Sequence, residues 1–112
     1  MSRVYIPNRG PHNYDEAQKF GRLVYCTEGS LDKFDTAQMY RILSDSMKNS
    51  DEQDYILLTS LTSLCCIACG ILSAKHQQLH LLIHQGGQYV RRSLYFNTQE
   101  ADGNVAVTHS KR

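Results

Sequence analysis

The chain has 112 residues, a length that suits one domain and leaves no room for two independent cores. Hydrophobic residues make up 41% and charged residues 21%, as expected for a globular protein. The formal net charge is +1, and because Lys and Arg are scattered rather than gathered into a block, the sequence gives no strong signal for nucleic acid as a partner. The first residues lack the apolar segment and cleavage site of a signal peptide, so we expect a cytoplasmic protein.

The N-terminal part of the chain predicts two short strands with a short helix between them. Residues 3–7 form the first strand, which ends at a proline-bearing turn. In the helix that follows, Asn13 is the expected N-cap, Glu16 completes a capping box three residues later, and Gly21 ends the helix. Residues 22–26 are β-branched and aromatic and form the second strand.

The middle of the chain predicts a helix, a buried strand and a second, cysteine-rich helix. Asp35 caps the first of these helices, whose apolar residues recur at helical spacing: Met39, Ile42, Leu43 and Met47. Residues 55–58 are an unbroken apolar run, as a strand buried on both faces requires. The hydroxyl-rich segment 59–63 then leads into a helix that ends near residues 75–76.

Two β-prone runs, 79–84 and 88–96, flank a glycine-bearing turn and predict a hairpin. The order of elements is therefore β-α-β-α-β-α-β-β. Strands separated by helices pair in parallel through right-handed crossovers, so the sequence predicts a single small three-layer α/β domain over residues 1–97, with a mostly parallel sheet and a C-terminal antiparallel hairpin. Residues 98–112 are polar, and we expect them to form a mobile tail.

One segment also admits a membrane interpretation. Residues 55–74 contain no charge over about 20 residues, the length that crosses a bilayer as a helix. Four hydroxyl residues lie within it and favour a strand and a helix joined by a polar turn: Thr59, Ser60, Thr62 and Ser63. A small membrane-anchored protein spanning at 55–74 is therefore the lesser alternative.

The four cysteines favour reduced core thiols over a disulfide framework. Three of them, Cys65, Cys66 and Cys69, fall within one predicted helix, where mutual disulfides are awkward. Cys66 and Cys69 form a C-x-x-C, but its apolar spacer argues against a redox motif. Together with His76 and His80 they make a valid zinc ligand set, whose middle spacer is too short for the common zinc finger. We therefore expect no metal and no cofactor.

Polar loops follow the first three strands, at residues 8–13, 27–30 and 59–63. Because the C-terminal ends of parallel strands meet at one edge of a sheet, these loops should together offer a guanidinium, hydroxyls and N–H groups to a phosphate-bearing ligand. Arg9 is the expected charge-assisted contact. The candidate ligand-binding residues are Asn8, Arg9, Thr27, Glu28, Ser30, Thr59, Ser60 and Thr62. His12 and Glu28 are weaker candidates for a catalytic acid/base pair.

No Walker-type phosphate loop, dinucleotide-binding G-x-G-x-x-G or hydrolase G-x-S-x-G motif is present. The sequence accordingly predicts a small non-enzymatic domain that binds a nucleotide or another phosphate-bearing ligand at the strand-end loops. The alternative is an accessory module acting through protein contacts, because three helices, one of them short, leave part of a two-faced sheet uncovered. Both hypotheses predict a homo-oligomer. In size and pattern the chain resembles accessory proteins of phages and mobile elements, a resemblance that rests on no specific motif and implies no activity.

Overall fold

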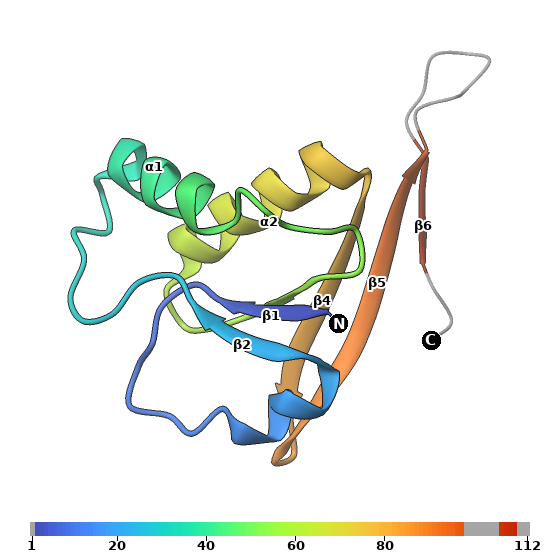
Figure 1. Cartoon of the computed structure of the whole chain (residues 1–112), viewed down its shortest axis with the longest axis horizontal. Coiled ribbons are helices and arrows are strands. Elements are labelled where there is room, and N and C mark those ends of the chain that lie inside the picture. The colour runs from blue at the N-terminus through green and yellow to red at the C-terminus, as the bar shows by residue number, and fades with distance from the viewer. Residues whose placement is uncertain (1, 98–105, 110–112) are drawn as a thin grey trace.

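The computed structural model describes residues 2–97 and 106–109, and Figure 1 shows how the helices and strands are arranged. The predicted order of strands and helices is confirmed, including the hairpin. The elements are β1 (Arg3–Ile6), the 3-10 helix η1 (Asp15–Phe20), β2 (Arg22–Tyr25), α1 (Thr36–Ser46), β3 (Tyr55–Leu57), α2 (Thr62–His76), β4 (Gln78–Gln85), β5 (Gln88–Asn97) and β6 (Ala106–His109).

The described strands form one sheet in the order β2-β1-β3-β4-β5-β6. β2, β1, β3 and β4 run parallel, whereas β5 runs antiparallel to β4 and β6 antiparallel to β5. β6 falls within the predicted polar tail and pairs with the end of β5, where Leu94 faces His109 in the register. Residues 98–105 and 110–112 of that tail lie outside the described residues.

The direction of each crossover decides which face of the sheet its helix covers. The chain moves from β1 to β2 on one side, and then returns across β1 to β3. Right-handed crossovers that move in opposite directions place their connecting helices on opposite faces of the sheet. In agreement with this rule, α1 and α2 lie together on one face and η1 lies on the other (Figure 1).

The larger core lies between the sheet and the helices α1 and α2. Asp35 caps α1 as predicted, since its carboxylate accepts a hydrogen bond from the Gln38 amide at 3.1 Å. Burial of each large apolar side chain here contributes about 1.5–3 kcal/mol. The buried residues of this core are Tyr5, Met39, Leu43, Met47, Ile56, Leu64, Ala68, Leu72 and Leu79.

The smaller core lies under η1, where the predicted capping box is wrong. η1 is a 3-10 helix with Tyr14 at its N-cap position and no side-chain cap. Asn13 instead accepts a hydrogen bond from the Asp15 amide at 2.8 Å, in a local turn typical of asparagine. Six residues are too few for a stable α-helix, and burial of Tyr14 and Ala17 against the sheet holds the segment in place.

A buried carboxylate joins the beginnings of β1 and β3. Asp54, whose side chain is fully buried, accepts a hydrogen bond from the Arg3 amide at 2.8 Å and another from the Asp51 amide at 2.8 Å. The Arg3 guanidinium lies 3.3 Å from the same carboxylate and balances its charge. Because a buried charge is tolerated only when paired and hydrogen-bonded, these contacts fix β1 beside β3.

The segment considered as a membrane span is divided between a strand and a helix. β3 ends at Leu57 and α2 begins at Thr62, with a loop between them. Among the helices that the structure describes, none has the length and apolar character needed to cross a bilayer.

His80 of β4 lies in a buried polar cluster on the η1 face of the sheet. Its Nδ1 is 2.7 Å from the Ser93 hydroxyl, and its Nε2 donates to the Gln78 side-chain oxygen at 3.1 Å. Burial lowers the pKa of His80 below its ordinary value of 6.5, with the charge of Arg91 acting in the same direction and Glu52 opposing both. Folding therefore favours the neutral imidazole of His80 over the protonated one, relative to the unfolded chain.

We expect the free energy of unfolding to fall on acidification below about pH 6.5, partly because of His80. Since its pKa is lower in the folded state, the unfolded chain takes up the proton first, and stability present above the unfolded pKa is lost as the pH falls. Urea unfolding of the wild type and His80→Gln between pH 7.5 and 5 measures this, and the variant should show the shallower pH dependence. If the free energy of unfolding depends on pH equally in the wild type and the variant, the role of His80 is contradicted. A loss of stability that is the same at every pH does not affect this comparison.

Candidate functional site

The strand order creates a switch point between β1 and β3. The connection after β1 leads to β2 on one side, and the connection after β3 leads to β4 on the other. The two loops therefore leave neighbouring strands in opposite directions. In open α/β sheets, the crevice that this leaves at the C-terminal ends of the strands is where ligands bind.

A cavity of about 410 Å³ lies at this switch point. Its walls come from the loop after β1, the loop between β3 and α2, and the end of the β4–β5 hairpin. The lining residues are Asn8, Gly10, Pro11, His12, Asn13, Tyr14, Leu57, Leu58, Thr59, Ser60, Leu61, His84 and Tyr89. No Lys, Arg, Asp or Glu is among them, and the lining combines polar residues with apolar ones such as Leu57, Leu58 and Leu61.

Aromatic rings form one part of this lining. Tyr14 and Tyr89 are buried, and each has a histidine ring packed edge-on against it. The ring centroids are 6.3 Å apart for His12 and Tyr14, and 5.3 Å apart for His84 and Tyr89. Burial, together with the nearby Tyr14 and Tyr25, raises the pKa of the Tyr89 phenol, which therefore stays protonated and able to donate a hydrogen bond.

The helix α2 begins at the cavity lining. Leu61, its N-cap residue, lines the cavity and provides no side-chain cap. The first N–H groups of a helix have no acceptor within the helix, and they carry its positive partial charge. Cys65 holds the preceding loop in position, because its sulfur accepts a hydrogen bond from the Thr59 amide at 3.3 Å.

The loop after β2, which was expected to contribute ligands, supports the cavity from outside. Thr27 is buried, and its hydroxyl donates to the Pro7 carbonyl at 2.7 Å and lies 2.8 Å from Asn8 Oδ1. Thr27 thus anchors the loop after β1. Neither it nor Ser30, which is exposed, lines the cavity.

Arg9, the expected phosphate contact, lies outside the cavity lining. Its guanidinium is 3.6 Å from the Glu28 carboxylate and stacks over the Tyr25 ring, 4.4 Å from the ring centroid. Glu28 likewise lies outside the lining, so the cavity contains His12 without the acidic partner proposed for it. Thr62 is also outside it, and of the predicted ligand residues Asn8, Thr59 and Ser60 line the cavity.

Sequence reasoning missed Tyr14, His84 and Tyr89. β4 is eight residues long and β3 is three, so β4 extends past the end of its neighbour toward the switch point. The turn at Gly86 and Gly87 has positive φ at both residues, as a tight hairpin requires, and pairs His84 with Tyr89. The two-glycine turn was a usable signal that these two side chains share one face.

The cysteines and histidines considered as zinc ligands do not form a cluster in the described part of the chain. In the described part of the chain, no three His, Cys, Asp or Glu residues are grouped as a metal would require. Cys66 is exposed, which corrects its assignment to the core, whereas Cys65 is buried. Burial, with the neighbouring Cys65 and Cys66 thiols adding to it, raises the pKa of Cys69 to about 12. Cys69 is therefore a poor nucleophile at neutral pH.

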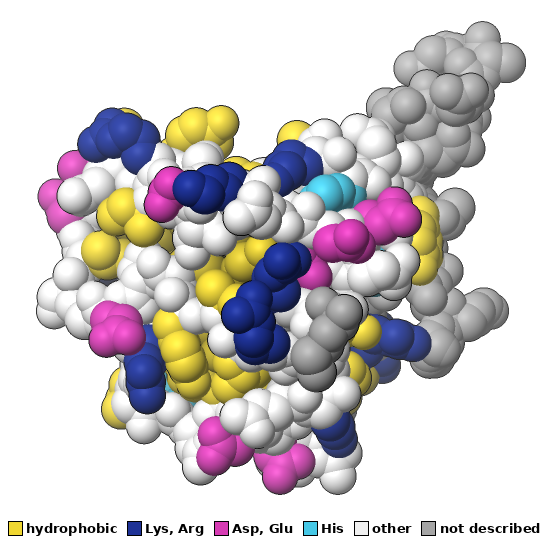
Figure 2. Space-filling model, viewed as in Figure 1, with side chains coloured by type: hydrophobic (Ala, Val, Ile, Leu, Met, Phe, Trp, Pro, Cys, Tyr) yellow, Lys and Arg dark blue, Asp and Glu magenta, His cyan; other side chains and the backbone are white. Residues whose placement is uncertain are grey.

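On the face shown in Figure 2, acidic and basic side chains are interspersed with apolar ones. A face that binds duplex nucleic acid is expected to carry a predominance of positive charge, and this face does not. The fold and the cavity together define a small α/β domain with a pocket at the switch point of a mostly parallel sheet.

Comparison with known proteins gives a family to this domain. The family described as Phage Pam3 gp32-like protein matches residues 2–98, and the chain therefore belongs to that family. The chain is also similar to a protein of Methanothermobacter thermautotrophicus described as a probable cysteine desulfurase, with 29% identity over 101 residues. That match covers 89% of this chain and 25% of the relative, so the chain spans about a quarter of the relative's length. No solved structure matches the chain.

Proposed function

We propose that this domain is a non-enzymatic binding module that holds a small phosphate-bearing ligand in the cavity between β1 and β3. The observation that carries the proposal is the coincidence of three features. A cavity of about 410 Å³ lies where the topology of an α/β sheet favours ligand binding, and a helix without a side-chain cap begins at its wall.

The polar groups of the cavity suit a phosphate. The open N–H groups and positive partial charge at the start of α2 attract anions, and the Thr59 and Ser60 hydroxyls lie beside that helix end. Asn8 and Asn13 provide side-chain amides on the other wall. No carboxylate lines the cavity to repel an anion.

The same lining gives little support to an enzyme. Activation of a hydroxyl as a nucleophile requires an adjacent base. Within the described residues, no hydrogen bond joins Thr59 or Ser60 to His12 or His84, and Thr59 is bonded to the Cys65 sulfur instead. The activity named for the Methanothermobacter relative belongs to a protein of which the match covers a quarter, so we do not transfer it to this domain.

Ser60→Asp should weaken phosphate binding without unfolding the protein. Ser60 is exposed and lines the cavity beside the start of α2, where a carboxylate competes with a bound anion for the helix amides and repels it. A thermal-shift screen of mono-, di- and cyclic nucleotides and simple phosphates identifies a ligand, and titration calorimetry should then show binding at least about tenfold weaker in the variant.

Ser30→Asp is the matched control, because it places the same charge in an exposed strand-end loop outside the cavity. Ser30→Asp should bind the ligand found in the screen with the same affinity as the wild type. Stabilisation by none of the anions, or equal loss of affinity in the two variants, would overturn the proposal.

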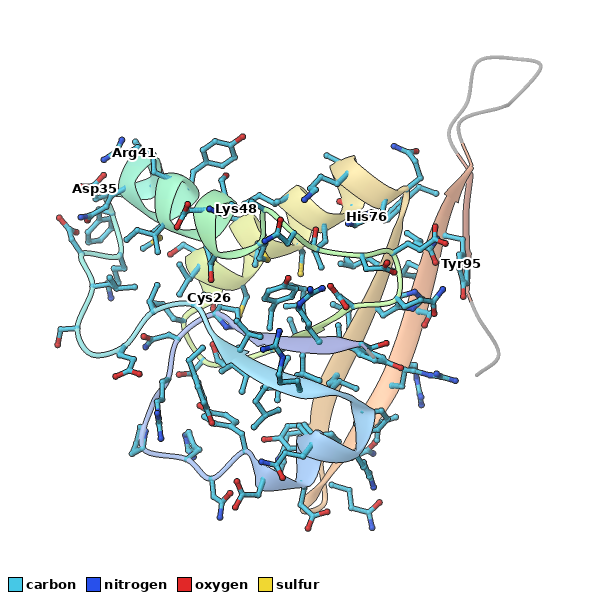
Figure 3. The ribbon with its side chains drawn as sticks, viewed as in Figure 1. Cys26, Asp35, Arg41, Lys48, His76 and Tyr95 are labelled. Atoms are coloured by element: carbon cyan, nitrogen blue, oxygen red, sulfur yellow. The ribbon has the colours of Figure 1, made fainter. Side chains whose placement is uncertain are left out.

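A second candidate function is self-association through the helical face. A groove of about 460 Å³ between α1 and α2 is lined mainly by apolar residues, together with Ser44 and Lys75, and Tyr40 at its side is 57% exposed. Next to the groove-lining residues of α1 lie Arg41 and Asp45, Lys48 follows the end of the helix, and Figure 3 shows Arg41 extending away from the domain. A surface of alternating charge is complementary to itself across a two-fold axis, which makes a second copy of this chain the fitting partner.

If the groove is such an interface, light scattering should give a mass above the 12.8 kDa of one chain. Tyr40→Ser should then return the protein to a monomer, because it removes the exposed ring from the groove. Phe34→Ser is the control, since Phe34 is 83% exposed but lies outside the groove lining. A monomeric wild type at high concentration would contradict self-association.

A further inference from the structure

We infer that the cavity selects a monophosphate of mononucleotide size that carries a planar aromatic ring, and binds it without a divalent cation. This inference rests on the proposed function, which it narrows from phosphate-bearing ligands in general to one class. It follows from two properties of the lining, namely its lack of charged side chains and its pairs of aromatic rings.

The charge of the lining limits the number of phosphates. Sites for di- and triphosphates neutralise their charge with Lys or Arg, or with Mg²⁺ held by carboxylates. Neither kind of side chain lines this cavity, and Arg9, although it belongs to the loop after β1 that forms one wall, is paired with Glu28 outside the lining. A single phosphate carries less negative charge, which the amides at the start of α2 and the neighbouring hydroxyls can stabilise.

The rings indicate what is attached to that phosphate. Tyr89 and His84 pack edge-on where the hairpin forms part of the lining, and Tyr14 and His12 form a similar pair. Aromatic side chains at a binding site favour a planar ring, by stacking or by edge contact. A volume of about 410 Å³ is in the lower part of the range for small-molecule sites, which suits a single nucleotide.

Titration calorimetry with AMP and UMP as purine and pyrimidine probes tests this directly. ATP with Mg²⁺, ribose 5-phosphate, adenosine and inorganic phosphate serve as comparisons. We expect one of the two monophosphates to bind about tenfold more tightly than ATP with Mg²⁺, and about three- to tenfold more tightly than ribose 5-phosphate. EDTA should leave the affinity for the monophosphate unchanged.

His84→Ala tests the contribution of the rings. His84 is exposed, so its removal should leave the fold intact, yet it lines the cavity against Tyr89. The variant should lose about three- to tenfold in affinity for the monophosphate and keep its affinity for inorganic phosphate. Gln85→Ala, at the next exposed residue of the same hairpin and outside the lining, should change neither.

The possible failures are distinguishable. Tighter binding of ATP with Mg²⁺, or equal binding of ribose 5-phosphate and the mononucleotides, would overturn this inference and leave the proposed function standing. If adenosine binds as tightly as AMP, the role of the phosphate is contradicted both in this inference and in the proposed function. Binding of none of the phosphate compounds would overturn the inference and the proposed function together.

Discussion

The parallel pairing of β1 with β3 is the contact on which the arrangement of the domain depends. It is a short ladder, in which Val4 lies opposite Tyr55 and Tyr5 opposite Ile56. The buried Asp54 carboxylate reinforces it from the N-terminal side by binding the Arg3 amide and guanidinium. Because β1 also pairs in parallel with β2, fixing this register brings the C-terminal ends of three strands to one edge of the sheet.

At that edge, some polar side chains hold the loops in place and others line the cavity, a division that composition alone does not show. Thr27 anchors the loop after β1, and the Arg9–Glu28 ion pair lies beside it, all outside the cavity lining. An exposed pair of this kind contributes little to stability, about 0–1 kcal/mol. What remains at the cavity is a lining without Lys, Arg, Asp or Glu beside the start of α2, and this lack of charged residues is the basis for proposing a ligand of low charge.

Local signals predicted most of the fold, and long-range pairing decided the rest. The Asp35 cap, the apolar run at 55–58 and the glycine turn are readable from neighbouring residues, and each predicted its element correctly. The 3-10 form of η1 depends on burial of its side chains against a sheet formed by distant residues. The same is true of the site: Asn8, Thr59 and Ser60 follow from the parallel topology, but His84 and Tyr89 reach the cavity through the unequal lengths of β3 and β4.

The most direct test of the central claim, that the switch-point cavity is an anion site, is an NMR titration of ¹⁵N-labelled protein with inorganic phosphate. We predict saturable shifts that are largest at the amides of Ser60 and Leu61, which line the cavity where α2 begins, because the anion would bind to the open donors there. Largest shifts at Arg9 and Glu28, or no saturable shift at any residue, would contradict it.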